Sequence, residues 1–579
     1  MAELHDVVIR SGTVVDGSGG PTWVADVAVN GGKIVRIGDV PGKGREEIDA
    51  SGLIVTPGFV DIHTHYDGQV TWEHRLHPSS HHGVTTAVTG NCGVGFAPCR
   101  PHPRETLVRV MEGVEDIPEI VMTAGIPWNW ETFPEYLDAL SERRYDIDFA
   151  TQLAHSAVRV YVMGERGELG EPATPEEMRQ MSAIVTEAIR AGAFGVTTSR
   201  HEGHRTVEGQ LAPSINAAEE ELLALADGLR QAGTGVFQLV PEGYVGIKPA
   251  EDIMRLIRRI ATAAGRPLSF SLVQKPDNPG LVLRLLELTR EARADGLEIR
   301  AQVFPRPVGL LFGLGLSLHP FRFHPSYVEI HDLPLEQRVA EMRKPARRAR
   351  ILAEHPVHTN PYSVRLVSSF EMSFPLGDPV NYEPEGSQTL QEIARAGATT
   401  PAEVAYDLLL ENGGNSIMLN PMSNFAGGNL ETVRKMITDE NTLIGLGDGG
   451  AHYGMVCDSS YPTTLLSHWA RDRKEGRVPL EWAIKRLSYD NAMAVGLTDR
   501  GLLAVGKKAD INIIDHARLT LHAPTSVFDL PAGGRRLMQA AEGYVATLVS
   551  GHVTYRNGKH TGALPGRLVR SSEFSMPAG

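Results

Sequence analysis

Two histidines separated by one residue end a mainly apolar segment near the start of the chain. This segment runs from Val55 to Ile62, and His63 and His65 follow it in GFVDIHTHYDG. Because residues i and i+2 of a strand face the same side, their two imidazoles should project together. Neutral imidazole is a common metal ligand, so the pair predicts a divalent metal site. Two hydrogen-bonded structural histidines are the alternative interpretation.

Two further residues have side chains that could complete such a site. Asp448 follows another apolar run in TLIGLGDGGAH, where glycines leave room around the carboxylate. Cys92 lies in the Gly-rich stretch TTAVTGNCGVGFAP, just after a second predicted strand. A thiolate is a good ligand for a borderline-soft ion such as zinc. The alternatives are a capping role for Asp448 and a small buried side chain for Cys92.

The elements that must position these residues alternate between helix and strand through the middle of the chain. PEEMRQMSAIVTEAIRAGA precedes FGVTTSR, and AAEEELLALADGLRQAG precedes TGVFQLVP. The strand segments are apolar throughout, as is typical of parallel strands that are buried on both faces. Candidate strands end near Ile62, Val88, Leu153, Thr198, Val240, Val273, Val303 and Leu446. This pattern predicts an α/β fold, a (β/α)8 TIM barrel, with its site at the carboxyl ends of the strands.

Strand-rich segments flank this alternation at both ends of the chain. Residues 1–56 and 496–579 contain short apolar runs separated by glycine turns, such as DVVIRSGTVVDGSG and VATLVSGHVTYRNGK. We assign the barrel to residues 57–495, with an insertion near 309–415 because that stretch exceeds a normal loop. Within the insertion, the sequence predicts a helix from Leu335 to Ala353.

Composition narrows the class of protein. The formal charge of −14 over 579 residues argues against a nucleic-acid-binding surface, which would be basic. No run of about 18 apolar residues indicates a membrane span, and no signal peptide is recognisable at the start. Three cysteines do not make a disulfide framework in so long a chain. We therefore expect a cytoplasmic protein.

The ordered motifs of almost the whole chain resemble those of the amidohydrolase superfamily. The resemblance is carried by GFVDIHTHYDG, GVTTAVTGNCGVG, AGAFGVTTSR and GDGGAH. It is also carried by AHSAVRVYVMG, AMAVGLTDRGLLAVGKKADINIID and VSGHVTYRNGK. The branch that the chain resembles most is that of the N-acyl-D-amino-acid deacylases, or D-aminoacylases. The resemblance implies a (β/α)8 barrel beside a small β-sandwich that the two terminal segments build together. It also implies a metal, usually zinc, held by His63, His65, Cys92 and Asp448.

The chain departs from this family at two ligand positions. Family members carry a histidine after strand five, where this chain has Gln238 in FQLVPEG. They carry another after strand six, where Val273 or Gln274 stands before the retained Lys275. Because these histidines normally complete the tightly held zinc site, we expect about one metal ion per chain, with zinc as the expected ion. No lysine ends strand four, so a carbamylated-lysine bridge is not expected.

A third departure concerns the substrate. Family deacylases hold the substrate carboxylate with an arginine shortly after the strand-eight aspartate, but here the first arginine after Asp448 is Arg471. The candidates for substrate binding are therefore Lys275, Arg200, Arg205, Arg306, Gln238 and His155. A buried, hydrogen-bonded structural histidine is the alternative for His155.

Together these features predict hydrolysis of a carbon–nitrogen amide bond. A bound divalent ion lowers the pKa of its water, and Asp448 would act as general base and then as general acid. The alternatives are a deaminase or cyclic-amide hydrolase on the same scaffold, and a metal-depleted pseudoenzyme that binds a ligand. The expected partner is a small-molecule amide substrate. The sequence leaves a homo-oligomer open, and it predicts binding to neither nucleic acid nor a membrane.

Overall fold

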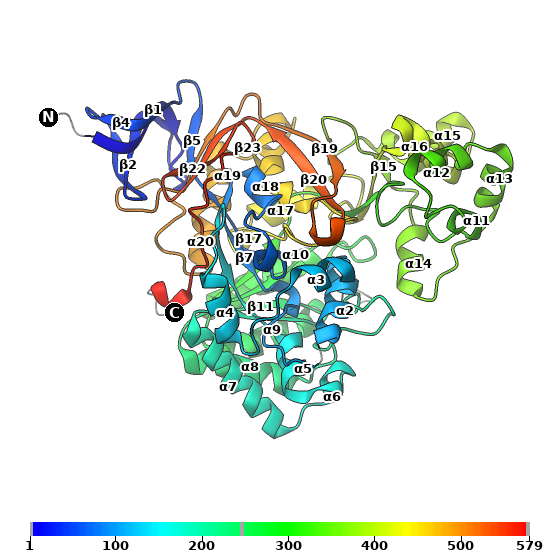
Figure 1. Ribbon diagram of the computed structural model, residues 1–579, viewed down its shortest axis with the longest axis horizontal. Coiled ribbons are helices and arrows are strands. Elements are labelled where there is room, and N and C mark those ends of the chain that lie inside the picture. The colour runs from blue at the N-terminus through cyan, green and yellow to red at the C-terminus, as the bar shows by residue number, and fades with distance from the viewer. Residues whose placement is uncertain (1–3, 103, 244–247, 575–579) are drawn as a thin grey trace.

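The computed structural model describes residues 4–102, 104–243 and 248–574. Figure 1 shows a strand-rich region at the upper left, a central region of helices and strands, and a helical lobe at the right. The first region is built from both ends of the chain, and the lobe is formed by residues in the yellow-green part of the sequence. The candidate metal ligands belong to the central region.

Strands from the two ends of the chain form one nine-stranded sheet, in the order β23-β22-β21-β18-β5-β1-β2-β3, with β4 paired to β1. Its strands are β1 (Leu4–Val14), β2 (Trp23–Asn30), β3 (Lys33–Gly38), β4 (Lys43–Asp49), β5 (Ile54–Pro57), β18 (Ile511–Ile514), β21 (Tyr544–Val549), β22 (His552–Arg556) and β23 (Lys559–His560). Gly31 and Gly32 turn β2 into β3 with φ of 55° and 75°, as a two-residue hairpin requires. A separate hairpin pairs β19 (Thr520–Val527) with β20 (Arg536–Glu542). The boundaries at residues 56 and 496 stay predictions.

The central strands are parallel and form two sheets. The first contains β6 (Phe59–Asp61), β7 (Val84–Thr89) and β8 (Asp148–Thr151). The second has the order β17-β13-β12-β11-β10-β9 and contains β9 (Leu153–Ala154), β10 (Gly195–Ser199), β11 (Val236–Val240), β12 (Leu268–Ser271), β13 (Ile299–Val303) and β17 (Thr442–Ile444). Only Gln152 separates β8 from β9, and together they correspond to the single strand that was predicted to end near Leu153. The strand predicted to end at Val273 ends at Ser271, because the side chain of Asn424 binds the backbone N–H of Gln274.

Contacts at the other edge bring β6 near β17. An isolated parallel bridge joins Thr64 to Gly449, just after these two strands. The Asn491 side chain donates hydrogen bonds of 2.8 Å to the carbonyls of Val60 and Ile444, one on each sheet. A cavity of about 240 Å³ is lined by Ile62 and Gln152, which directly follow β6 and β8, and by residues of β11, β12, β13 and β17. These contacts place the edges of the two sheets beside each other.

Helices cover the outside of these strands. They include α1 (Gln69–Trp72), α2 (Arg104–Glu115), α3 (Glu119–Gly125), α4 (Phe133–Ser141), α5 (His155–Met163), α6 (Glu165–Glu168), α7 (Pro175–Ala191), α8 (Glu219–Ala232), α9 (Ala250–Ala264), α10 (Leu281–Ala294), α17 (Glu431–Thr438), α18 (Tyr461–Thr464), α19 (Leu480–Leu487) and α20 (Tyr489–Ala494). Helix α7 begins with a capping box in which Thr174 Oγ1 accepts from the N–H of Glu177 and the Glu177 carboxylate accepts from the N–H of Thr174. Four successive helices, α7 to α10, each precede a strand of the second sheet, which matches the predicted alternation.

The insertion forms a lobe with its own apolar core. Strands β14 (Val308–Phe312), β15 (Phe374–Pro375) and β16 (Met418–Ser423) form its sheet. Its helices are α11 (Pro325–Val328), α12 (Leu335–Met342), α13 (Pro345–Ala353), α14 (Pro361–Ser368), α15 (Leu390–Gly397) and α16 (Pro401–Leu410). The prediction of one helix from Leu335 to Ala353 is wrong, because Pro345 has no N–H to donate and starts a new helix. The core includes Phe312, Phe321, Tyr406 and Met418.

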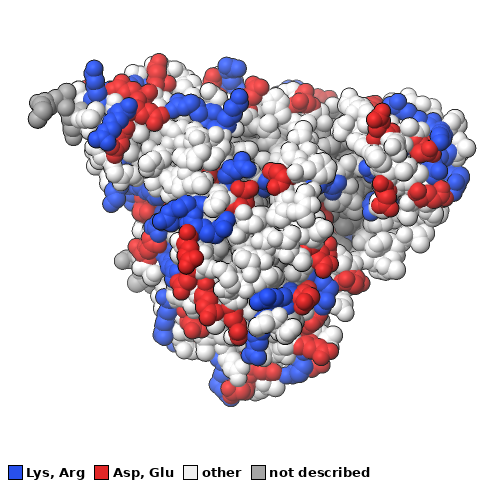
Figure 2. Space-filling view, viewed as in Figure 1, with Lys and Arg blue, Asp and Glu red and all other residues white. Residues whose placement is uncertain are grey.

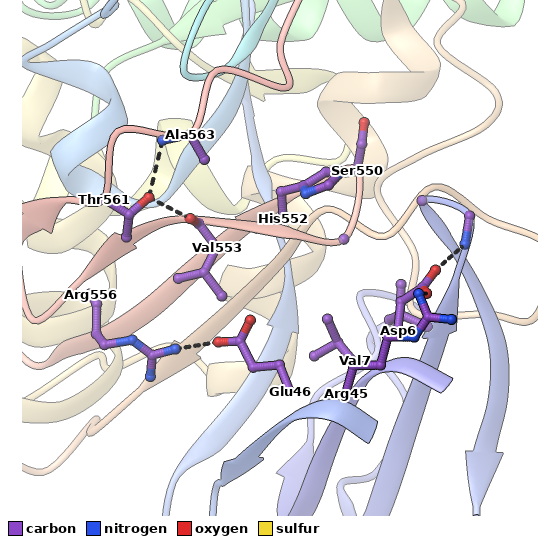
Figure 3. Close-up of a pocket in the computed structure, with 14 residues that line it drawn as sticks. Asp6, Val7, Arg45, Glu46, Ser550, His552, Val553, Arg556, Thr561 and Ala563 are labelled. Carbon is purple, nitrogen blue, oxygen red and sulfur yellow. Dashed lines mark hydrogen bonds and ion pairs between the residues drawn. The ribbon is translucent and has the colours of Figure 1, made fainter. Parts of the chain in front are cut away.

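The surface of the described residues carries mixed charges and one further cavity. Figure 2 shows Lys and Arg side chains interspersed with Asp and Glu on the face in view. A cavity of about 850 Å³ lies in the terminal sheet, where the ion pair between Glu46 and Arg556 joins two of its walls (Figure 3). None of the predicted site residues lines that cavity. Across the described ranges, every helix is too short or too polar to serve as a membrane span.

A buried ion network fastens the central strands to the terminal sheet. Arg500 Nη1 lies 2.7 Å from Asp148 Oδ2, and Lys508 Nζ lies 3.1 Å from the same oxygen. Burial alone would raise the pKa of Asp148, but Lys508 and Arg500 outweigh burial and lower the pKa to about 2. The ionised carboxylate therefore stabilises the fold above the ordinary aspartate pKa near 4, and this stabilisation declines as the pH falls towards 2.

Replacing Arg500 with Met should therefore lower the free energy of unfolding by about 3 kcal/mol, the lower end of the range for a broken buried pair because Lys508 remains. Denaturant unfolding at pH 7 measures the change. Arg284→Met is the control, since Arg284 and Glu251 form an exposed pair that should contribute less than about 1 kcal/mol. Equal unfolding free energies for the two variants would contradict the role of the network.

Candidate metal centre

Four predicted ligands meet at the carboxyl ends of three strands. His63 and His65 follow β6, Cys92 follows β7, and Asp448 follows β17. His63 Nε2 lies 3.2 Å from Cys92 Sγ, and the donor atoms of His63, His65 and Cys92 all lie within 4.8 Å of one another. Asp448 Oδ1 lies 3.5 Å from the Nε2 atoms of both histidines. The structure thus brings all four residues together.

The spacing of these donors fits a zinc ion. Zinc lies about 2.0–2.1 Å from nitrogen or oxygen ligands and about 2.3 Å from sulfur, so tetrahedral ligands are roughly 3.4–3.6 Å apart. The separations of 3.2 Å between His63 and Cys92 and of 3.5 Å between Asp448 and each histidine lie at or close to that range. Two imidazoles, a thiol and a carboxylate are also the ligand types that zinc uses. The residues present therefore fit the ion that the sequence predicts.

The backbone around Cys92 and Asp448 is unusual. Both residues have left-handed conformations, with φ of 56° and 46°, which non-glycine residues rarely adopt. Gly93 lets the Cys92 loop lie against β10, because a Cβ at Gly93 would sit 2.9 Å from Thr198 Cα. Such conformations persist only where the surroundings hold them, and they concentrate at functional sites.

Burial sets the protonation of the ligands before a metal binds. Burial raises the pKa of the Cys92 thiol to about 12 and lowers the pKa of His63 to about 4. Burial would raise the pKa of Asp448, but His65 and His63 outweigh it and hold the pKa well below its usual range. Cys92 is therefore a thiol and Asp448 a carboxylate at neutral pH, and metal binding would release the thiol proton.

Two residues that the sequence analysis missed contact the histidines from behind, and a third, His452, contacts one of these two. His63 Nδ1 donates to Gln302 Oε1 at 2.7 Å, and His65 Nδ1 lies 3.4 Å from Glu115 Oε1. The other oxygen of Glu115 lies 3.4 Å from His452 Nε2. Gln302 could have been found as a polar residue in the apolar run of β13, and His452 as the end of GDGGAH. Glu115 ends a helix and carries no local signal.

The two positions where the family has histidines hold amides with other partners. Gln238 in β11 is buried, and its Oε1 accepts a 3.2 Å hydrogen bond from the backbone N–H of Cys92. Gln274 binds Asn424 and Ala426 instead, at the end of β16. Val273 is partly buried and has no ligand atom. These residues support the Cys92 loop and the lobe rather than a second cluster of ligands.

The predicted substrate-binding residues lie in different surroundings. Both ring nitrogens of His155 are engaged, at 2.8 Å from Thr198 Oγ1 and 2.7 Å from Glu221 Oε1. Arg306 is buried and donates to Asp458, Ser460 and the carbonyl of Cys457. These bonds already engage both ring nitrogens of His155 and both Nη atoms of Arg306 in holding elements together.

The three remaining cationic candidates follow strands β10 and β12. Lys275 Nζ donates to the carbonyl of Gly243 at 2.8 Å, and Arg200 contacts Glu242 at 3.6 Å. Arg205 donates to the carbonyls of Glu202 and Gly209 within its own loop. A side chain that anchors a substrate would have to exchange part of these contacts.

Comparison with known proteins supports the motif resemblance. A family model described as the amidohydrolase family matches residues 46–555. The N-acyl-D-aspartate deacylase of Alcaligenes xylosoxydans xylosoxydans is 26% identical over 582 residues, covering 97% of this chain and 95% of the relative.

Solved structures show the same fold. A D-aminoacylase structure that addresses the role of its binuclear metal center, with one-metal activation and second-metal attenuation, has a TM-score of 0.65 and 24% identity. The N-acyl-D-glutamate deacylase of Bordetella bronchiseptica, complexed with zinc and a phosphonate inhibitor, has a TM-score of 0.65 and 22% identity. Each alignment covers 98% of this chain and 100% of the other.

The donor set predicts about one zinc ion per chain, because Gln238 and Val273 replace two ligands. Elemental analysis of purified protein measures the ratio. Replacing His63 and His65 with Ala should abolish bound metal while unfolding stays cooperative. The control replaces the exposed His74 and His552 with Ala, which should leave the zinc content unchanged. Two tightly held ions in the unmodified protein, or one in the His63 and His65 variant, would contradict this stoichiometry.

Proposed function

Since this chain belongs to the amidohydrolase family, and thus to the hydrolases of carbon–nitrogen bonds other than peptide bonds, we propose that it hydrolyses an amide bond of a small molecule with one zinc ion. His63, His65, Cys92 and Asp448 would hold the ion. We also infer that the two parallel sheets are parts of one (β/α)8 barrel, because the bridge from Thr64 to Gly449 and the bonds of Asn491 bring β6 beside β17. In such a barrel the carboxyl ends of the strands carry the site.

One observation carries the catalytic interpretation above all. The side chains of His63 and His65 are each 1% exposed, whereas that of Asp448 is 24% exposed. A structural zinc site closes all four ligands off, whereas a catalytic site keeps an open position. The opening lies beside the carboxylate, which supports a role for Asp448 in chemistry as well as in binding the ion.

The carboxylate of Asp448 is suited to move a proton. It is ionised at neutral pH because His65 and His63 hold its pKa low. When bound, the ion lowers the pKa of water and polarises a carbonyl. Asp448 accepts the proton of the attacking water and then donates it to the leaving nitrogen, so the proton count balances. His63 and His65 hold the site, and their Nδ1 contacts keep the Nε2 atoms turned towards it.

N-acyl-D-amino acids are the first substrates to test, because a relative is a deacylase of N-acyl-D-aspartate. Lys275, Arg200 and Gln238 are the proposed substrate contacts, and His155 supports their loops from α5. A deaminase or cyclic-amide hydrolase remains the second enzymatic candidate. The close grouping of His63, His65 and Cys92, with Asp448 beside both histidines, weighs against a metal-depleted pseudoenzyme. The three cysteines are free thiols, so the cytoplasm stays the proposed location.

Replacing Asp448 with Asn tests the proton transfer. The amide keeps the shape of the side chain but cannot accept the proton, so turnover should fall by roughly 10²-fold or more. Steady-state kinetics on the best substrate measures the change, and zinc content is determined in parallel. Asp458→Asn is unsuitable as a control because Asp458 binds Arg306, so the exposed Asp295→Asn serves instead. Near-normal turnover in Asp448→Asn would sink the mechanism.

Lys275 can be tested as the anchor of a substrate carboxylate. If it holds that group, Lys275→Ala should raise KM for N-acyl-D-amino acids and leave KM for neutral amides unchanged. The reason is that only the anionic substrates lose an ion pair. Kinetics on paired acidic and neutral substrates provides the comparison. Equal losses on both classes would assign Lys275 to the fold, through its bond to Gly243.

A further inference from the structure

Glu115 occupies a place that is costly for a carboxylate. It is the last residue of α2, and its side chain is 2% exposed. The carboxyl end of a helix carries partial negative charge, which disfavours an acidic side chain. A buried carboxylate also requires partners that compensate for lost hydration. The partners that the structure gives it are His65 and His452, each 3.4 Å from one carboxylate oxygen.

The next residue, Asp116, also binds the segment that contains His452. Asp116 has a left-handed conformation with φ of 51°. Its Oδ2 accepts a 2.9 Å hydrogen bond from the N–H of Gly454 and a 3.1 Å bond from Ser317 Oγ at the start of the lobe. The N–H of His452 also bonds to the carbonyl of Glu115. Two adjacent acidic residues therefore hold the segment that follows Asp448.

We propose that Glu115 is a positioning residue for the metal centre, an inference that rests on the proposed function. Its carboxylate faces Nδ1 of His65, so the proton of that ring belongs on Nδ1 and Nε2 is left for the metal. Through His452 the same carboxylate fixes the loop that carries Asp448. Glu115 thus links His65, which follows β6, to Asp448, which follows β17, without being one of the four donors itself.

The contacts of the other histidine support this interpretation. His63 Nδ1 donates to the neutral amide of Gln302, whose Nε2 donates to Ser269 Oγ at 2.9 Å. Each of the two histidines therefore has an oxygen behind its Nδ1, the Gln302 amide oxygen at hydrogen-bond distance for His63 and the Glu115 carboxylate at ion-pair distance for His65. Such partners orient the ring and raise its basicity, and their loss typically weakens metal binding by about 10- to 100-fold.

The test is the zinc dissociation constant of Glu115→Gln, measured by competition with a chelator. Gln keeps the size of the side chain but removes the charge, so zinc should bind about 10- to 100-fold more weakly. The Co²⁺-substituted protein should show a shifted visible absorption spectrum, because the His65 ring is held less firmly. Glu112→Gln is the matched control, since Glu112 lies one turn earlier on α2 and binds the N–H of Glu119.

Unchanged zinc affinity and an unchanged Co²⁺ spectrum in Glu115→Gln would overturn the positioning role and leave the proposed function standing. Failure of the unmodified protein to bind zinc would overturn both proposals. If Glu115→Gln does not fold, Glu115→Asp gives the answer, because the shorter side chain draws the carboxylate away from His65. Wild-type zinc affinity in a folded Glu115→Asp protein would then contradict the inference.

Discussion

The site depends on one backbone junction between segments at opposite ends of the parallel strand series. The N–H of Asp448 bonds to the carbonyl of His63 at 3.1 Å, and the N–H of His65 bonds to the carbonyl of Gly449 at 2.7 Å. These two bonds place the base beside both histidines. They can form only if β6 and β17 lie side by side, which Asn491 secures from the other end. The base and the two histidines can therefore meet only if the strands between β6 and β17 keep their pairing register.

Burying a polar cluster at this junction costs free energy, and neighbouring side chains offset part of that cost. Gln302 accepts a hydrogen bond from His63, the Glu115 carboxylate lies at ion-pair distance from His65, and Gln238 accepts from the backbone of Cys92. A buried polar group without such a partner would cost roughly 1–3 kcal/mol. These partners come from a helix and two different strands, so they also rigidify the mouth of the strands. Stability and precise ligand placement thus arise from the same contacts.

The residue types and spacing allowed the four donors to be predicted from the sequence, whereas the side chains behind them were mostly not predictable. His63 and His65 follow from strand periodicity, and Cys92 and Asp448 from their positions after apolar runs. Glu115 lies beside these residues only because α2 packs against them, and such packing leaves no periodic pattern in the sequence. The helix predicted from Leu335 to Ala353 is two helices, because Pro345 has no N–H to donate and starts the second one. The strand series could be predicted from apolar runs and glycine turns, whereas the pairing of the two terminal segments was expected from the family resemblance.

The amide at Gln238 explains how this centre can differ from a two-metal one without losing its shape. A histidine at that place could bind metal through one nitrogen, but Gln238 uses its oxygen to hold the N–H of Cys92. The Cys92 loop therefore keeps its left-handed turn and its contact with β10. Gln274 is used in a similar way at the next strand, where its side-chain Oε1 accepts a hydrogen bond from the backbone N–H of Ala426. With both positions committed to backbone support, the thiol of Cys92 stays grouped with His63 and His65, whose Nε2 atoms also lie next to Asp448.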